Sequence, residues 1–228
     1  MQAVPDRFET LDAVLHERRS VRGFLPDPIP EEALHRIFAA AQQAPSNCNV
    51  QPWVVHVVSG DAAEGMRTAL HDHAATGAPE DPDFALTANY PGEYRTRRID
   101  AAIALFSVTG VARDDKVARE ASFLRNFAFF DAPHAAFIFL PDWCGMREAA
   151  DCGMYAQSLM LALTAAGYAS CAQGALSWYA PIVRERLGVP GDMRLLFGLA
   201  FGTEDPAHPA NAARTTRAAV TDAIRFHR

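Results

Sequence analysis

The residues best suited to chemistry lie near the N-terminus, in the run Arg18-Arg19-Ser20-Val21-Arg22. This run places three guanidinium groups and one hydroxyl within five residues, at the expected end of a helix. Arginine offers a planar fork for bidentate contacts with phosphate oxygens, and serine adds a short donor. The run therefore fits a phosphate monoester, although a solvated basic turn has the same composition.

A second polar segment follows, with the sequence Pro45-Ser46-Asn47-Cys48-Asn49-Val50-Gln51-Pro52-Trp53. It holds four hydroxyl or amide side chains between two prolines, directly before an apolar run. By itself this composition is typical of a loop whose side chains cap neighbouring backbone groups. Neither this segment nor the arginine-rich run defines a function alone.

Each polar segment follows a predicted helix. The first helix is expected from Thr10 and should stop by Gly23, ahead of a proline-rich stretch. The second opens after Pro30 and ends before Pro45, and its apolar residues recur at helical spacing. These apolar residues are Leu34, Ile37, Phe38 and Ala41. The two helix ends therefore fix where the polar segments begin.

Apolar runs in the sequence predict a sheet. Residues 53–58 and 135–140 are short, strongly apolar runs and are expected to be core strands. Residues 168–172 are expected at a strand edge, residues 195–201 form another strand, and residues 220–226 are a candidate for a last one.

The remaining helices differ in their expected burial. Residues 149–166 are apolar on nearly every face, which predicts a long, buried central helix. Residues 181–187 predict a short helix with proline at its start and Gly188 after its end. The least regular part of the chain lies between Gly60 and Phe130, where residues 98–106 and 115–126 are expected to be helical.

The composition bounds the class of protein. The chain has 228 residues and a formal net charge of −6, half of its residues are apolar, and 21% are charged. These values are ordinary for one globular domain. We therefore expect a single α+β domain over residues 1–228, with residues 61–130 as a variable helical insertion or lid.

Several other classes receive no support from the sequence. No stretch approaches 18 apolar residues, so no membrane span is expected, and the acidic charge argues against a nucleic-acid partner. The N-terminus lacks a secretory signal and the four cysteines form no C-x-x-C pair, so we expect reduced thiols in a cytoplasmic protein. His71 and His73 lack further ligands nearby, so no metal site is expected. Dinucleotide, P-loop and serine-hydrolase motifs are also missing.

The two polar segments in tandem resemble the FMN-dependent nitroreductase family. The resemblance rests on R-R-S-V-R-x-F followed, about 25 residues later, by P-S-x-x-N-x-Q-P-W. It continues through Gln173-Gly174-Ala175-Leu176 and the segment 184–190, and closes with Asn211-x-x-Arg214-x-x-Arg217. It thus spans most of the chain and is weakest between Gly60 and Asn126.

The resemblance implies a set of cofactor-binding residues. Those that would hold the FMN phosphate and ribityl chain are Arg18, Arg19, Ser20 and Arg22 near the N-terminus, with Arg217 and, more weakly, Arg214 near the C-terminus. Those that would reach the flavin from the partner subunit are Pro45, Ser46 and Asn49. Those whose backbone would lie near the flavin ring are Gln173, Gly174 and Ala175. No catalytic side chain is implied, because the flavin carries the redox chemistry.

The resemblance also implies a fold and an activity. The fold is nitroreductase-like, with a central mixed or antiparallel sheet flanked by helices, and two chains form an intertwined homodimer with flavins at the interface. The reaction takes hydride from NADH or NADPH at flavin N5 and then reduces a nitroaromatic, quinone or similar small electrophile by a ping-pong mechanism. The alternatives are another reaction on the same fold (reductive dehalogenation, enone reduction or flavin modification) and a flavin-binding protein without turnover.

Overall fold

The computed structural model describes residues 6–87 and 89–228. In these residues, four strands form one sheet in the order β1-β2-β4-β3, and every neighbouring pair is antiparallel. The strands are β1 (Val54–Ser59), β2 (His134–Pro141), β3 (Ala169–Gln173) and β4 (Met193–Gly202). The sheet is therefore antiparallel throughout, one of the two forms that the family resemblance implied.

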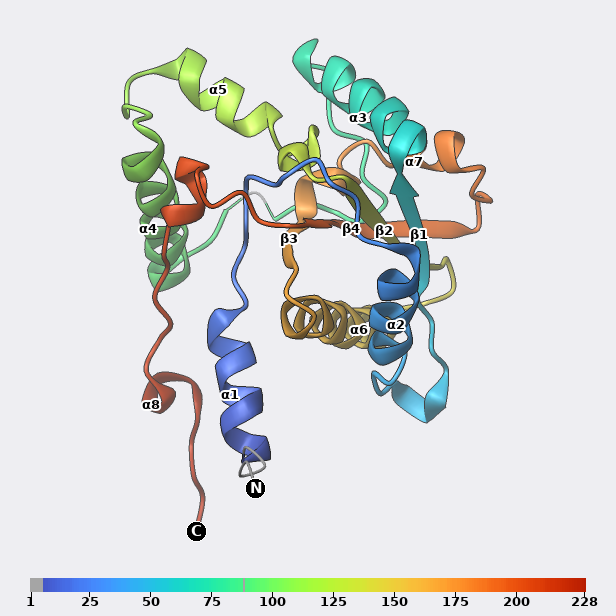
Figure 1. Ribbon diagram of the computed structural model, residues 1–228, viewed down its shortest axis with the longest axis vertical. Helices are drawn as coiled ribbons and strands as arrows, with labels where there is room; N and C mark the ends of the chain where they lie inside the picture. The colour runs from blue at the N-terminus through green and yellow to red at the C-terminus, as the bar shows by residue number, and fades with distance from the viewer. Residues whose placement is uncertain (1–5, 88) are drawn as a thin grey trace.

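Helices cover both faces of this sheet, as Figure 1 shows. The longer helices are α1 (Arg7–Glu17), α2 (Glu31–Ala41), α3 (Gly60–Ala75), α4 (Gly92–Thr109), α5 (Lys116–Leu124), α6 (Met146–Ala165) and α7 (Ala180–Leu187). The short ones are α8 (Val220–Ala223) and the 3-10 turns η1 (Asn47–Asn49), η2 (Phe129–Asp131), η3 (Gly174–Ser177) and η4 (Pro209–Ala212). α2 and α6 lie on one face, and α3 and α7 lie on the other.

The position of β2, with both of its faces covered, explains why its sequence is continuously apolar. Ala135, Phe137 and Phe139 pack into the core on the α3 side, whereas Ala136, Ile138 and Leu140 pack into the core on the α6 side. Successive strand residues point to opposite faces, so a strand covered on both sides needs apolar residues at every position. The prediction of a core strand at residues 135–140 is confirmed.

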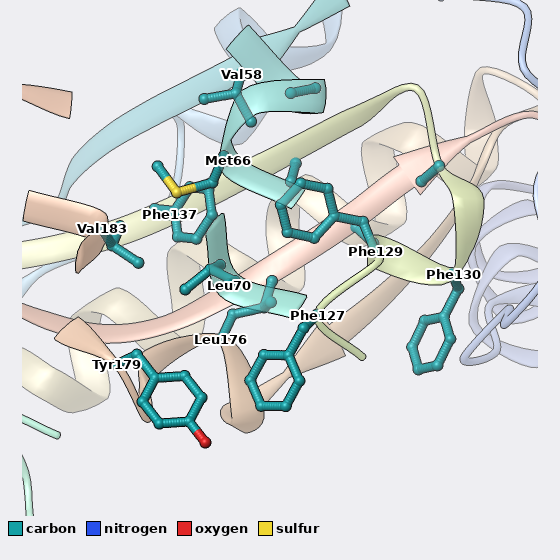
Figure 2. Close-up of a cluster of buried hydrophobic side chains, with 14 of the residues drawn as sticks. Val58, Met66, Leu70, Phe127, Phe129, Phe130, Phe137, Leu176, Tyr179 and Val183 are labelled. Carbon is teal, nitrogen blue, oxygen red and sulfur yellow. The ribbon is translucent and has the colours of Figure 1, made fainter. Parts of the chain in front are cut away.

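The core on the α3 side is rich in aromatic rings (Figure 2). Phe127, Phe129 and Phe130 are all buried there, which places them in the core rather than in a lid. Met66 and Leu70 from α3 pack into the same cluster. Helix α3 is therefore a core helix, which was not predicted from the sequence of this irregular segment.

Other predicted elements are confirmed, with shifted ends. Helix α2 ends at Ala41, α4 contains the helix expected at 98–106, α5 lies within the one expected at 115–126, and α7 has proline in its first turn. Gly188 ends α7 in the left-handed conformation, at φ 63°, which glycine adopts without steric cost. Strands β3 and β4 match the segments expected at 168–172 and 195–201.

Three expectations need correction. The core strand expected at 53–58 is β1 (Val54–Ser59), which lies at the edge of the sheet and has three of its six residues exposed. Residues 220–226 form no strand within this chain; α8 and an exposed extended tail stand there instead. Helix α6 is buried along one side only, and Met146 and Met154 are exposed on it.

Among the described residues, no helix combines the length and apolarity that a membrane crossing requires.

His134 at the start of β2 makes the fold sensitive to acid. Its side chain is only 1% exposed. Its Nε2 accepts the Ile29 N–H at 2.8 Å, so the proton of the neutral ring lies on Nδ1, which faces Ser59 Oγ at 2.6 Å. Burial lowers the pKa of His134 below its usual 6.5. The folded protein therefore holds this ring neutral.

We expect the free energy of unfolding to fall as the pH drops below about 6.5. Between the folded and unfolded pKa of His134, the unfolded chain binds the extra proton, which costs up to about 1.4 kcal/mol per pH unit. Urea unfolding between pH 7.5 and 5 measures this slope. His134→Gln should flatten it, whereas Arg36→Gln, which removes a group that stays charged throughout this pH range from an exposed position on α2, should leave the slope unchanged. If His134→Gln shows the same dependence of the free energy of unfolding on pH as wild type, His134 is not the group responsible for it.

Candidate functional site

The predicted phosphate-binding residues from both ends of the chain meet in one pocket. This pocket has a volume of about 430 Å³ and lies between the C-terminal end of α1, the segment 213–217 and the side of α4. The predicted residues that line it are Arg18, Arg19, Ser20, Arg22, Arg214 and Arg217. Its walls also include Leu105 of α4 and His16 of α1.

Backbone pairing at the edge of the sheet positions the N-terminal half of this pocket. The Val21 N–H donates to Ser170 O of edge strand β3 at 3.1 Å, and Ser20 forms a parallel bridge with Ser170. Further along, the Leu25 N–H donates to Thr203 O at 2.9 Å, just beyond β4. The arginine-rich run is therefore extended and held against the sheet, which satisfies backbone groups that an open edge would expose.

The pocket concentrates positive charge in a chain whose net charge is negative. Burial and the neighbouring Arg217 together lower the pKa of the half-buried Arg18 guanidinium. Two like charges close together in a partly desolvated site raise the free energy of the protein without a ligand. A bound dianion such as a phosphate monoester would neutralise both charges.

Arg22 and Arg19 have different partners within the chain. The guanidinium of Arg22 lies over the Phe130 ring, 5.9 Å from its centroid, and its Nη1 donates to Ser20 O at 3.2 Å. Arg19 forms a half-buried ion pair with Glu204, so its charge is already balanced inside the protein. Arg18 and Arg22 are thus better placed than Arg19 to bind an anion.

The loop with Pro45, Ser46 and Asn49 does not line this pocket. It follows α2, on the opposite side of α6 from α1 (Figure 1). Ser46 Oγ accepts the Gln51 N–H at 2.9 Å, and Asp151 of α6 accepts the Asn47 N–H at 3.1 Å. Pro45 and Asn49 are exposed. The loop is therefore anchored to its own chain while part of it stays open to another molecule.

Gln173, Gly174 and Ala175 lie where β3 ends and η3 begins. The Gln173 side chain is buried, and its Nε2 donates to Asn126 O at 2.9 Å. This side chain therefore fastens β3 to the end of α5 and does not reach the arginine pocket. Gly174 is exposed, so its backbone is open to a ligand.

Three features of the pocket escaped the sequence analysis. Glu204 forms an ion pair with Arg19, the Phe130 ring lies under the guanidinium of Arg22, and Leu105 lines one wall of the pocket. Glu204 lies 185 residues from Arg19, and no local spacing indicates such a pairing. Only a three-dimensional arrangement identifies these contacts.

The fold and the pocket together define a class of protein. An α+β chain with a single antiparallel sheet brings arginines from its two ends into one site, which suits a ligand with a terminal phosphate. The chain belongs to the nitroreductase family, whose model matches residues 15–203.

Proteins of known activity and a solved structure extend this assignment over nearly the whole chain. The nitroreductase NfnB of Mycolicibacterium smegmatis is 39% identical over 224 residues, which cover 98% of this chain and 95% of that protein. The chloronitrobenzene nitroreductase of Comamonas testosteroni is 32% identical, with 95% and 96% covered. The crystal structure of the FMN-dependent nitroreductase NfnB from Mycobacterium smegmatis in complex with NADPH has a TM-score of 0.94, at 39% identity, and covers 98% of this chain and 100% of that one. The predicted nitroreductase-like fold is confirmed.

Proposed function

We propose that the protein is an FMN-dependent oxidoreductase that uses NADH or NADPH to reduce nitroaromatic compounds, quinones or related small electrophiles. The observation that carries this proposal is the pocket in which Arg18, Arg22, Arg214 and Arg217 converge. The named activities of the relatives, which act on nitro compounds, and the FMN-dependent structural neighbour support it.

The residues in the pocket fit FMN at its phosphate end. The lowered pKa of Arg18, caused first by burial and then by Arg217, indicates a partly desolvated site where two positive charges lie close together. Arginine forks and the Ser20 hydroxyl supply the donors that a phosphate needs, and they would fix the position of the ribityl chain. When bound, FMN supplies a ring that accepts hydride from the nicotinamide and passes electrons to the acceptor. The chain itself binds and orients, and no side chain acts as an acid or base in the proposal.

The experiment that tests this function measures both half-reactions. The purified protein is mixed anaerobically with NADH or NADPH, and bleaching of the flavin absorbance is followed. A panel of nitro, quinone, enone and halophenol acceptors is then added to the reduced protein. Bleaching followed by reoxidation with nitro compounds or quinones supports the proposal. A bound flavin that neither nucleotide reduces would indicate a binding protein, and reoxidation by enones or halophenols alone would indicate another reaction on this fold.

We propose that two chains assemble into a homodimer with the flavin at their interface. Helix α1 and the C-terminal tail project from the body of the chain (Figure 1) and expose large apolar side chains, among them Phe8, Val220 and Phe226, whose exposed fractions are 72%, 67% and 79%. Exposed apolar surface of this extent is typical of an interaction site. The exposed loop with Pro45 and Asn49 would reach the flavin of the partner in such an assembly.

We propose that α4 and α5, two helices of residues 61–130 that hold no fully buried residue, form a lid that contributes to the choice of acceptor. Tyr94 at the start of α4 is 56% exposed, and the Arg97 guanidinium lies over its ring at 5.5 Å. Exposed aromatic rings on a segment above a scaffold are suited to contact with flat substrates.

Replacing Tyr94 by alanine should change kcat/KM for aromatic acceptors about two- to tenfold, because an aromatic contact contributes roughly 0.5–1.5 kcal/mol. FMN affinity should stay constant, since Tyr94 does not line the arginine pocket. Steady-state kinetics with several acceptors and a flavin titration measure the two quantities. Tyr94→Phe, which keeps the ring, is the matched control. Equal losses for all acceptors together with weaker FMN binding would contradict the lid assignment.

A further inference from the structure

Asn211 is a buried amide at the junction of the two halves of the arginine pocket. It lies in η4 and is 5% exposed. Its Oδ1 accepts the Arg22 N–H at 2.7 Å, and its Nδ2 donates to Gly23 O at 2.8 Å and to Asp205 O at 2.9 Å. Both amide donors and the amide oxygen are therefore used: the bonds to Arg22 and Gly23 join segments distant in sequence, and the bond to Asp205 is local.

The backbone of Asn211 serves the C-terminal half of the pocket. Its carbonyl oxygen accepts a hydrogen bond from Arg214 Nη1 at 2.7 Å. The same residue thus fixes the backbone of Arg22 through its side chain and the guanidinium of Arg214 through its main chain. Arg22 and Arg214 both line the pocket.

A buried amide of this kind is costly unless all of its polar atoms are paired. Here the pairing is satisfied only when residues 22–23 and residues 205–211 hold one relative position, because hydrogen bonds weaken steeply as their geometry departs from linear. An apolar side chain at this position would fill space but would impose no such alignment. The amide therefore sets the geometry between two segments that are otherwise separated by most of the chain.

We propose that Asn211 is a positioning residue that aligns the N-terminal and C-terminal arginines on the FMN phosphate. This inference rests on the proposed function, since it assumes that the pocket binds the phosphate of FMN. Asn211 does not touch the ligand in this proposal. It acts through Arg22 and Arg214, so its loss should weaken binding of the phosphate group specifically.

The test compares FMN with riboflavin, which lacks the phosphate, in the full-length protein. Flavin fluorescence gives the Kd of each ligand for wild type, for Asn211→Ala and for Asn211→Ser, the second variant serving if the first does not fold. Inorganic phosphate is titrated as a competitor of FMN. Leu163→Ala, at a fully buried position on α6 in the other core cluster, is the control for a general loss of stability.

In wild type we expect FMN to bind more tightly than riboflavin. In the Asn211 variants the Kd of FMN should rise about tenfold while that of riboflavin changes less than twofold, so the preference for FMN shrinks. Leu163→Ala should lower the melting temperature without changing the preference. The inference is overturned if the Asn211 variants keep the wild-type preference, or if Leu163→Ala reduces it equally. If wild type itself shows no preference for FMN and no competition by phosphate, the proposed function fails instead.

Discussion

Arg18→Ala and Arg217→Ala are each expected to weaken FMN binding about ten- to hundredfold. A hydrogen bond to a charged group contributes roughly 1.5–3 kcal/mol, and about 1.4 kcal/mol corresponds to a tenfold change in Kd. Both guanidinium groups line the pocket, and Arg217 is close enough to lower the pKa of Arg18. Each variant therefore removes one cation from a pair that would face the same phosphate.

The double variant Arg18→Ala/Arg217→Ala shows whether the two arginines bind the same phosphate or act at independent sites. Because both arginines would hold one ligand group, the losses should couple rather than add. Riboflavin should bind wild type and variants with similar, weak affinity. Arg36→Ala, at an exposed position on α2, is the matched control and should change nothing. Flavin fluorescence titrations measure all of these constants, and an Arg18→Ala protein that binds FMN within twofold of wild type would exclude a phosphate site here.

Elements with strong local signals could be predicted from the sequence. Helix α7 has proline at its start and Gly188 at its end, and both signals act within a few residues. Strand β2 is an unbroken apolar run because both of its faces are covered. In each case the sequence near the element carries the information that determines it.

Elements whose state depends on distant partners could not be predicted from the sequence. The run at 54–59 is apolar enough for a core strand, but its place at the sheet edge follows from the strand order. The buried residues of α3 recur at helical spacing, but two of the four are alanines and polar or charged residues stand between them, so the amphipathic pattern is weak. The tail at 220–226 is strand-like in composition and finds no strand beside it within the chain.

The candidate site also contains residues that could be predicted from the sequence and contacts that could not. The resemblance predicted arginines near both ends, through R-R-S-V-R-x-F and Asn211-x-x-Arg214-x-x-Arg217, and the structure brings them into one pocket. Their internal partners were not predictable, because Glu204 and Asn211 lie 185 and 189 residues from Arg19 and Arg22. Asn211 stands in a motif, but its pairing with Arg22, like that of Glu204 with Arg19, has no local signal and is found only when the two ends of the chain meet.

The same junction makes Gly23 intolerant of a side chain. A Cβ atom added at Gly23 would lie 2.2 Å from His208 Cγ and 2.5 Å from His208 Cβ, far closer than such atoms approach. The Gly23 carbonyl also accepts the Asp205 N–H at 3.0 Å and the Asn211 amide. A substitution must therefore push residues 205–211 away from the arginine-rich run and disturb both halves of the pocket.

Gly23→Ala is expected to lower the free energy of unfolding by about 1–3 kcal/mol, the usual cost of overpacking, and to weaken FMN binding in parallel. The second variant His208→Gly removes every His208 side-chain atom that the new methyl would meet. Adding it to Gly23→Ala should recover most of the lost FMN affinity, so the double-variant cycle should give a large favourable coupling. Gly153→Ala on α6 is the control, because nothing lies within 4 Å of its added Cβ and alanine favours a helix. It should leave FMN binding unchanged and should not destabilise the fold. Urea unfolding and flavin titration of wild type, the three members of the cycle (Gly23→Ala, His208→Gly and the double variant) and Gly153→Ala measure these effects. If His208→Gly restores neither stability nor affinity, the close approach of Gly23 to His208 does not account for the need for glycine there.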